Sequence, residues 1–548
     1  MNSLSSSRAE PLVESAGSAA RPLLTIAGCI LLVSLALLLG ILLRNDGHFA
    51  YTLDAPYTQM ALAEQIARGT YGLNPGEPAS PSSSILYPFL LALLSGLPLD
   101  QFAPLLVCLA ATILAAWLLY AVAQEAGVEV ERLTTAQLAA ITVTLTLALN
   151  LAGLAFAGLE HSLHVTLTIA SLLGLLRFIR RKEADWWWLA AITLLPLLRF
   201  EAAAALVADM LVLLAFRKWR HALGVGLVGA VTVGAFCLYL HSLGLPWLPS
   251  SVLSRSDVAS AGIGMGGGIL GLPRAIYAAY RTNLMAFGGT HIAVMIVVLL
   301  WSLARSRPPA MRVGAVDWAR PVAVGFFVLV ALAQLTAGSL SSFSRYEIYV
   351  LALGIAVFLV AYAPEANGFL RRITTFRCAA LCLSLLFVFA GYVFRTVDAV
   401  SAAGNIHDQQ YQLHRFVVEH WRRPFAADHP GWVNFRTPYY MLELSGLGSE
   451  EARRAKANAA GPDWMDDLAR RHDVGLAMLY DSLSPKVPGT WQPVARLRLK
   501  QRVVSAPGST ITFYATRPGE AETILAGLKQ MAPSLPRGAV LDFVTPAR

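Results

Sequence analysis

Residues 23–43 read LLTIAGCILLVSLALLLGILL, an unbroken stretch without a single charged side chain. A helix of about 20 apolar residues is long enough to cross the hydrocarbon core of a bilayer. This stretch therefore predicts a membrane span close to the N-terminus. It is too long for the apolar part of a signal peptide, and no small-x-small cleavage site follows it, so we expect a retained anchor.

The rest of the chain repeats this pattern. Of its 548 residues 56% are hydrophobic and 14% are charged, and the mean hydropathy is +0.56. A soluble protein cannot bury that much apolar surface, so lipid must be the solvent for much of the chain. We expect about eleven transmembrane helices. They lie near residues 23–43, 102–122, 134–155, 162–179, 186–199, 202–216, 222–241, 288–304, 320–340, 347–363 and 378–395.

The net charge of +9 indicates orientation in a membrane and not binding to nucleic acid. Basic residues cluster in short tracts between apolar runs, as at 177–182 and 217–220, which is typical of cytoplasmic loops. The run 84–97 has about 14 residues and contains Pro88, so we interpret it as an interfacial helix on the outer surface. This interpretation places every later basic tract inside. The N-terminus is then cytoplasmic and the C-terminus lies outside the cytoplasm.

The chain divides at residue 395, where the apolar runs stop. Residues 1–395 are expected to form the transmembrane domain, with a first periplasmic loop at 44–101. Residues 396–548 alternate helical and strand patterns and predict an extracytoplasmic α/β domain. Strands are expected near 425–428, 433–435, 439–444, 474–480, 494–499 and 510–515, and helices near 411–421, 452–459 and 464–472. This part of the chain has no cysteine, so no disulfide stabilises it.

Asp54 is the main candidate for chemistry in the first outer loop. It precedes a stretch with helical periodicity, so its carboxylate could be an N-cap or a general base in an outer cavity. The loop continues with ARG at 67–69, GLNPGE at 72–77 and LYP at 86–88. In this order the motifs resemble the first periplasmic loop of the C-superfamily glycosyltransferases (GT-C), which use polyprenyl-phosphate sugars. That family often has two adjacent acids, whereas here Leu53 precedes Asp54.

Further short motifs follow in the order of that family. Gly158-Leu159-Glu160 resembles its "G-M-E" turn and Arg199-Phe200-Glu201 its "R-P-E/D" turn. Ser254-Arg255 resembles the end of its "LPN…YAK" segment, and Ser344-Arg345-Tyr346 resembles its "aRY" motif. The resemblance implies that these residues bind substrate: Glu160, Arg199, Glu201, Arg255, Arg345 and Tyr346. Alternatively, Arg199 and Glu201 neutralise each other, and Arg345-Tyr346-Glu347 is an interfacial anchor.

The resemblance implies an inverting transfer of a sugar from a polyprenyl-phosphate donor to an extracytoplasmic glycan or lipid hydroxyl. Asp54 would act as the base, and arginines would hold the phosphate. The partners are then the lipid-linked sugar, the acceptor and membrane lipids, with no nucleic acid. We expect a multi-pass protein of the bacterial inner membrane, with the C-terminal domain in the periplasm. The alternative function is a transporter or flippase of lipid-linked glycans.

Three other features have structural interpretations. His161 and His164 stand three residues apart beside Glu160 and could bind a metal, but an interfacial pair is the favoured interpretation. No cofactor is expected, with a divalent metal left open. The run GIGMGGG at 262–268 follows no strand and is interpreted as a flexible lid and not as a nucleotide loop. Asp428 and His429 resemble catalytic groups, and a loop cap is the preferred interpretation.

Overall fold

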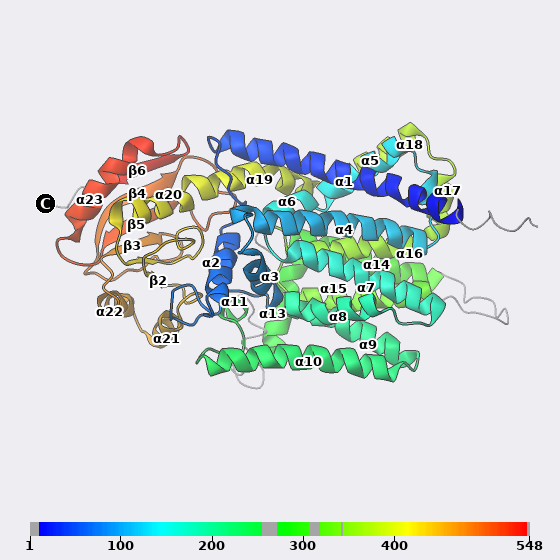
Figure 1. The fold of residues 1–548 in the computed structure, drawn as a ribbon, viewed down its shortest axis with the longest axis horizontal. Coiled ribbons are helices and arrows are strands. Elements are labelled where there is room, and N and C mark those ends of the chain that lie inside the picture. The colour runs from blue at the N-terminus through cyan, green and yellow to red at the C-terminus, as the bar shows by residue number, and fades with distance from the viewer. Residues whose placement is uncertain (1–9, 255–270, 306–317, 341–342, 545–548) are drawn as a thin grey trace, which may run out of the picture.

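The structure, a computed structural model, describes residues 10–254, 271–305, 318–340 and 343–544. It has two parts, a long helical bundle and a sheet domain packed on one end of it (Figure 1). This arrangement confirms the predicted fold class, a helical membrane protein with a C-terminal α/β domain. Arg255 and the glycine-rich run 262–268 lie outside the described residues.

Six helices of the described chain are long and apolar enough to cross a membrane. They are α1 (Glu10–Arg44), α4 (Ala103–Glu125), α7 (His161–Arg181), α10 (Trp219–Ser242), α14 (Phe287–Arg305) and α15 (Ala319–Ala337). Two bent pairs also pass by composition and raise the number of spans to eight. The first joins α16 (Ile348–Ala361) to α17 (Ala363–Leu370) at 79°, and the second joins α18 (Thr375–Val388) to α19 (Ala390–Asp408) at 77°.

The other three predicted spans form shorter helices. They are α5 (Thr135–Ala148) with α6 (Leu151–Phe156), α8 (Trp186–Leu198) and α9 (Ala203–Ala215). The break between α5 and α6 is at Asn150, which has a left-handed backbone with φ of 48°. Asn side chains tolerate that conformation better than most. The Oδ1 atom of Asn150 accepts a hydrogen bond from the Thr396 hydroxyl at 2.9 Å, which links the break to α19.

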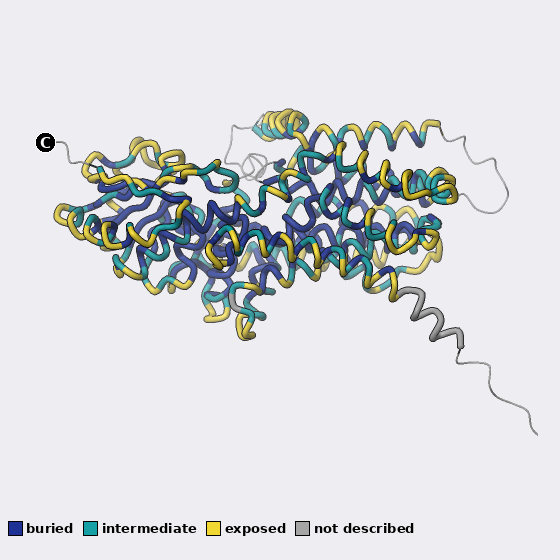
Figure 2. Tube along the Cα trace, turned by 90° about the horizontal axis from the view of Figure 1, so that it is seen from above, coloured by how far each residue is buried: buried dark blue, intermediate teal, exposed yellow. Residues whose placement is uncertain are grey.

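Burial separates the central helices from the peripheral ones. In α7, 83% of the most apolar window is buried, against 22% in α1 and α10. The two peripheral helices expose large side chains such as Leu43 and Leu227. Figure 2 shows the same trend along the chain, with exposed and intermediate stretches on the outside of the bundle and buried stretches inside it. Apolar side chains on an outer face are expected where lipid is the solvent. The site described below lies at the end of the buried helices that faces the sheet domain.

The short elements gather between the bundle and the sheet domain (Figure 1). α2 (Ala55–Ala67) packs on α3 (Leu86–Leu94), a nine-residue helix that is too short to span. This agrees with the interfacial helix expected at 84–97. The remaining short elements there are α11 (Ser250–Leu253), α13 (Gly271–Met285), η1 (Asp100–Phe102) and η3 (Phe200–Ala202). The turn η2 (Val130–Arg132) lies at the other end of the bundle, packed on α17.

The sheet domain has six strands in the order β2-β1-β3-β5-β4-β6. β1 (Phe425–Ala427), β2 (Met441–Glu443) and β3 (Leu476–Tyr480) pair in parallel, while β4 (Gln492–Leu499), β5 (Thr510–Ala515) and β6 (Ala539–Phe543) are antiparallel. α21 (Glu450–Asn458) and α22 (Asp463–Arg471) pack on one face. The other face carries α20 (Gln410–Arg415), a π-helical turn (Phe416–Trp421) and α23 (Glu520–Met531). A final 3₁₀ turn, η6 (Ala532–Ser534), precedes β6.

Most predicted elements of this domain are confirmed, and one is wrong. The strand expected at 433–435 is a series of turns, because the Gly431 N–H donates to Asn434 Oδ1 at 2.8 Å and curls the backbone. α19 runs without a break across the expected domain boundary at 395. A single apolar core then extends from α1 and the first loop through α19 into the sheet, so the two parts are packed as one body.

Candidate active site

Asp54 stands at the N-cap position of α2, but its side chain makes no capping hydrogen bond. Instead, Oδ1 accepts a hydrogen bond from the backbone N–H of Trp432 at 2.7 Å. Oδ2 is buried without a hydrogen-bond partner among the described residues, and it lies 3.9 Å from Nε2 of His429. Asp54 therefore occupies the N-cap position, but its carboxylate binds the tail segment at Trp432 and does not cap the helix.

The environment of Asp54 favours its neutral form. Burial raises the pKa of the carboxyl group to about 8, and the Trp432 N–H offsets part of that rise. The loop that follows β1, residues 428–435, is called the tail loop. It approaches Asp54 so closely that a Cβ atom on Gly431 would lie 1.9 Å from the Asp54 carboxyl carbon. Only glycine fits at that position, because any side chain would overlap the carboxylate.

A small cavity of about 50 Å³ lies beside Asp54. Its walls come from the start of α2, from the turn before α7, from Arg199 and Arg345, and from the tail loop at His429 and Pro430. Thr58 and Gln59 complete the α2 side. The structure thus brings Glu160, Arg199 and Arg345 together at one cavity, and Ala55, the residue after Asp54, lines it too.

Arg199 is held by two carboxylates. Its Nη1 donates to Glu160 at 2.9 Å, and its Nε and Nη2 donate to Glu201 at 2.9 and 2.6 Å. The guanidinium is buried, and a buried ion pair needs such hydrogen bonds to offset the cost of desolvation. One positive charge faces two negative charges here, so the cluster gives the cavity no net positive charge. The neutralisation alternative is confirmed, with Glu160 as a second partner.

Arg345 reaches the same cavity from the segment before α16. Its Nη2 donates to the Tyr346 hydroxyl at 2.8 Å, and its Cζ lies 4.6 Å from the centre of the Tyr346 ring. The Arg199 Cζ lies 5.0 Å from the same centre, so both guanidinium groups contact one buried aromatic ring. His161 meets that ring edge-on with centroids 5.0 Å apart. Tyr346 is therefore a buried spacer between two cations and not a headgroup anchor.

The histidine pair does not form a metal cluster with its neighbours. His164 stacks on Tyr349 with ring centroids 3.8 Å apart, away from the His161 contact. Among the described residues no group of three His, Cys, Asp or Glu side chains has the spacing for a metal ion. The interfacial pair favoured from the sequence stays a prediction, and in the structure both histidines are buried against tyrosine rings.

The tail loop holds the residues that the sequence interpretation missed. Asp428 accepts hydrogen bonds from the Tyr480 N–H and the Ser484 hydroxyl, so it is the loop cap that was preferred. His429, however, lines the cavity next to Asp54. The glycine and tryptophan at 431 and 432, directly after Asp-His-Pro, were the only sequence signal of this close approach.

The motif at 72–77 joins the first loop to the sheet domain. Asn74 Nδ2 donates to the Met441 carbonyl at 2.9 Å, and Asn74 Oδ1 accepts from the Met441 N–H at 3.1 Å. Glu77 accepts from the Ser449 hydroxyl at 2.7 Å and from Asn74 Nδ2 at 2.8 Å. One amide side chain thus pairs with the edge strand β2 as another strand would. These contacts hold the tail loop over Asp54.

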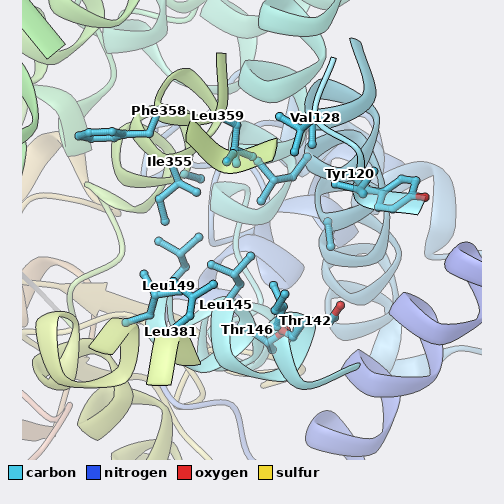
Figure 3. Close-up of a pocket in the computed structure, with 18 of the residues that line it drawn as sticks. Tyr120, Val128, Thr142, Leu145, Thr146, Leu149, Ile355, Phe358, Leu359 and Leu381 are labelled. Carbon is cyan, nitrogen blue, oxygen red and sulfur yellow. The ribbon is translucent and has the colours of Figure 1, made fainter. Parts of the chain in front are cut away.

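A much larger apolar cavity of about 960 Å³ lies inside the bundle, between α4, α5 and α7 on one side and α14, α16 and α18 on the other. Figure 3 shows Leu145, Leu149, Ile355 and Leu359 lining it, with Thr142 and Thr146 on α5. Nearly all the atoms that line it belong to apolar side chains, so a ligand in this cavity must be apolar too.

Comparisons with known proteins give one family model and several solved structures. The family model, described as a domain of unknown function (DUF8728), matches residues 404–514. No curated protein matches the chain. ArnT from Cupriavidus metallidurans, solved with undecaprenyl phosphate, is 14% identical over 90% of this chain and 98% of its own, with a TM-score of 0.47.

Two further structures are similar in fold. The oligosaccharyltransferase AglB from Archaeoglobus fulgidus, solved with an inhibitory peptide and a dolichol-phosphate, is 12% identical over 95% of this chain and 76% of its own, with a TM-score of 0.45. The arabinofuranosyltransferase AftD from Mycobacteria is 13% identical over 90% of this chain and 40% of its own, with a TM-score of 0.41.

Proposed function

We propose that this protein is a membrane glycosyltransferase that moves a sugar from a polyprenyl-phosphate donor to an acceptor hydroxyl outside the cytoplasm. One observation carries the proposal. A buried carboxylate, Asp54, keeps one oxygen without a hydrogen bond beside a cavity that two arginines line. A buried acceptor oxygen next to fixed cations is the arrangement that a displacement at a phosphate-linked carbon requires.

In the proposed reaction the acceptor oxygen attacks the anomeric carbon of the donor sugar. The bond between that carbon and the phosphate oxygen breaks, and its electron pair leaves with the polyprenyl phosphate. Asp54 Oδ2 takes the proton of the acceptor hydroxyl. The Trp432 N–H, 2.7 Å from Oδ1, orients the carboxylate for this step. The attack and the departure occur on opposite sides of the carbon, so the anomeric centre inverts.

Arg345 is the proposed phosphate ligand. The guanidinium of Arg199 already forms short ion pairs with Glu160 and Glu201. A phosphate would have to displace one of these carboxylates to bind it. Arg345 lines the cavity, and a guanidinium keeps its charge at any physiological pH. The Arg199 cluster would then position Tyr346 and the cavity wall, and contact the sugar through Glu160. Arg255 remains a candidate ligand from the sequence resemblance alone.

Substrate entry requires movement of the tail loop. The cavity of about 50 Å³ holds a few water molecules and not a sugar ring. The loop at His429 and Pro430 forms its outer wall, so withdrawal of this loop would admit the donor. The isoprenoid tail would lie in the apolar cavity of Figure 3, whose 960 Å³ is within the size range of lipid and drug sites.

The proposed setting is a bacterial inner membrane, with the N-terminus in the cytoplasm and the sheet domain in the periplasm. A cysteine introduced at exposed Asp46, in the first loop, should react with a membrane-impermeant maleimide added to intact cells with a permeable outer membrane. Labelling only after the inner membrane is opened would place the loop in the cytoplasm and contradict this topology.

The decisive test measures transfer by purified protein in lipid nanodiscs, with a radiolabelled polyprenyl-phosphate sugar and a membrane extract as acceptor source. Asp54→Asn should lower the initial rate by about 10²- to 10⁴-fold, the usual contribution of a general base. Asp46→Asn removes an exposed carboxylate from the same loop and should keep the normal rate. Full activity of Asp54→Asn would remove Asp54 from the mechanism. Movement of label across liposome membranes without transfer would support the flippase.

A further inference from the structure

A third cavity, of about 400 Å³, lies at the tail loop and shares no lining residue with the cavity beside Asp54. We call it the aromatic groove, because rings from four separate segments line it. They are Phe49, Phe102, Tyr411, Trp432 and Phe435. The volume falls within the range of small-molecule sites, about 300–1,000 Å³. Neither the proposed reaction nor the motifs of the sequence use this groove.

Four of the five rings form two pairs. Phe49 and Phe102 have centroids 4.9 Å apart, and Tyr411 and Trp432 have centroids 4.7 Å apart. Phe49, Trp432 and Phe435 are buried, whereas Phe102 is 38% exposed and Tyr411 is partly exposed. The rings of Phe102 and Tyr411 therefore offer apolar faces to a ligand with flat apolar faces of its own.

Polar groups stand at the edges of these rings. The Thr437 hydroxyl donates to the Val433 carbonyl at 2.8 Å, so His414 Nδ1, 3.2 Å from that hydroxyl oxygen, is the donor of their contact. Nε2 of the neutral ring is then an acceptor. His48 Nδ1 lies 3.2 Å from the Asn45 carbonyl and must donate to it, which leaves its Nε2 as an acceptor too. Both histidines line the groove.

The charge of the groove argues against an anionic ligand. Arg436 is the only cationic Lys or Arg side chain among the described lining residues, and its Nε is 3.0 Å from Glu64. A phosphate headgroup would have to compete with that carboxylate. The groove therefore combines aromatic faces with hydrogen-bond acceptors and a balanced charge. A ring that carries hydroxyl donors around its rim and C–H groups on its faces fits this chemistry.

We propose that the aromatic groove binds a sugar residue of a saccharide acceptor, at a distance from the hydroxyl that reacts. This inference rests on the proposed function, because it gives the acceptor its chemical class. Trp432 connects the two sites: its indole lines the groove, while its backbone N–H holds Asp54 at 2.7 Å. A sugar held against Phe102 and Tyr411 would therefore lie in the same groove as the indole of the residue that holds the carboxylate.

The experiment measures binding directly, by saturation-transfer NMR on the full-length protein in phosphatidylcholine nanodiscs. The probes are linear arabino-, manno- and gluco-hexasaccharides. At least one should bind, and Phe102→Ala should weaken its binding roughly 2- to 10-fold, the value of a lost aromatic contact. Phe89→Ala is the matched control, because Phe89 on α3 is 37% exposed and does not line the groove. It should leave binding unchanged.

Each result distinguishes the groove from the reaction. Asp54→Asn should bind the hexasaccharide normally although its transfer rate is about 10²- to 10⁴-fold lower. If that variant transfers sugar at the normal rate, the proposed reaction fails, and the comparison of Phe102→Ala with Phe89→Ala still tests the groove. No binding by any hexasaccharide, or equal losses in Phe102→Ala and Phe89→Ala, would overturn the inference. Loss of saccharide binding when phosphatidylglycerol replaces part of the phosphatidylcholine would assign the groove to a lipid headgroup and overturn it as well.

Discussion

Gly431→Ala is the sharpest perturbation of the proposed active site, because it adds a single methyl group beside Asp54. The added Cβ would lie 1.9 Å from the carboxyl carbon and 2.0 Å from Oδ2. Real Cβ contacts essentially never fall below 3.0 Å, so the loop and the carboxylate must separate by more than 1 Å. The φ angle of Gly431 is not positive, so alanine causes no backbone strain and the effect comes from this overlap.

A displacement of that size has a calculable effect on a reaction that depends on alignment. Misplacing a catalytic group by about 1 Å costs about 10²-fold in rate. We therefore expect Gly431→Ala to lower the initial rate of sugar transfer in nanodiscs by about 100-fold. Gly461→Ala is the matched control in the same domain, since a Cβ there meets nothing within 4 Å. Thermal unfolding of both variants should show that the protein remains folded.

The double variant separates this mechanism from a general disturbance of the loop. If Gly431→Ala acts only through Asp54, it should reduce activity no further in an Asp54→Asn background, because residues that act as one unit are not additive. Normal activity of Gly431→Ala would refute the close approach of the loop. A further large loss in the double variant would show that the loop has a role independent of Asp54.

Three further predictions follow from the same contacts. Since Asp54 must lose its proton to act as a base and burial raises its pKa to about 8, the transfer rate should rise about tenfold per pH unit below 8 and level off above it; a plateau reached near pH 5 would contradict this. Asn74→Ala should weaken the packing of the first loop on β2 by about 1–3 kcal/mol, because two hydrogen bonds to Met441 are lost. Limited proteolysis should then cleave the first loop faster than in the unchanged protein. Asn458→Ala, on the exposed end of α21, should not change the cleavage rate. Arg199→Gln should destabilise the protein by about 3–5 kcal/mol, because it leaves two carboxylates without their cation, whereas Arg371→Gln, which breaks an exposed pair, should leave the melting temperature unchanged.

The position of the site could be predicted in outline from the sequence. Asp54, Glu160, Arg199 and Arg345 each follow or precede an apolar run, and the alternation of runs places all four at one end of the bundle. Glu160, Arg199 and Arg345 do line one cavity, and Ala55, next to Asp54 in the chain, lines it too. The roles within the cluster could not be predicted, because Arg199 has acidic neighbours in two different turns and Glu160 was not recognised as its partner.

The sequence by itself determined the apolar surroundings of the helices, most of the elements and the end of the bundle where ionisable residues gather, because hydropathy and helical or strand periodicity are local properties of the chain. Only the tertiary structure decided which groups surround the Asp54 carboxylate. Its partner Trp432 lies 378 positions away, and the aromatic groove joins residues from both ends of the chain. No local pattern records such pairs, since they form only when the sheet domain packs on the first loop and excludes water from both.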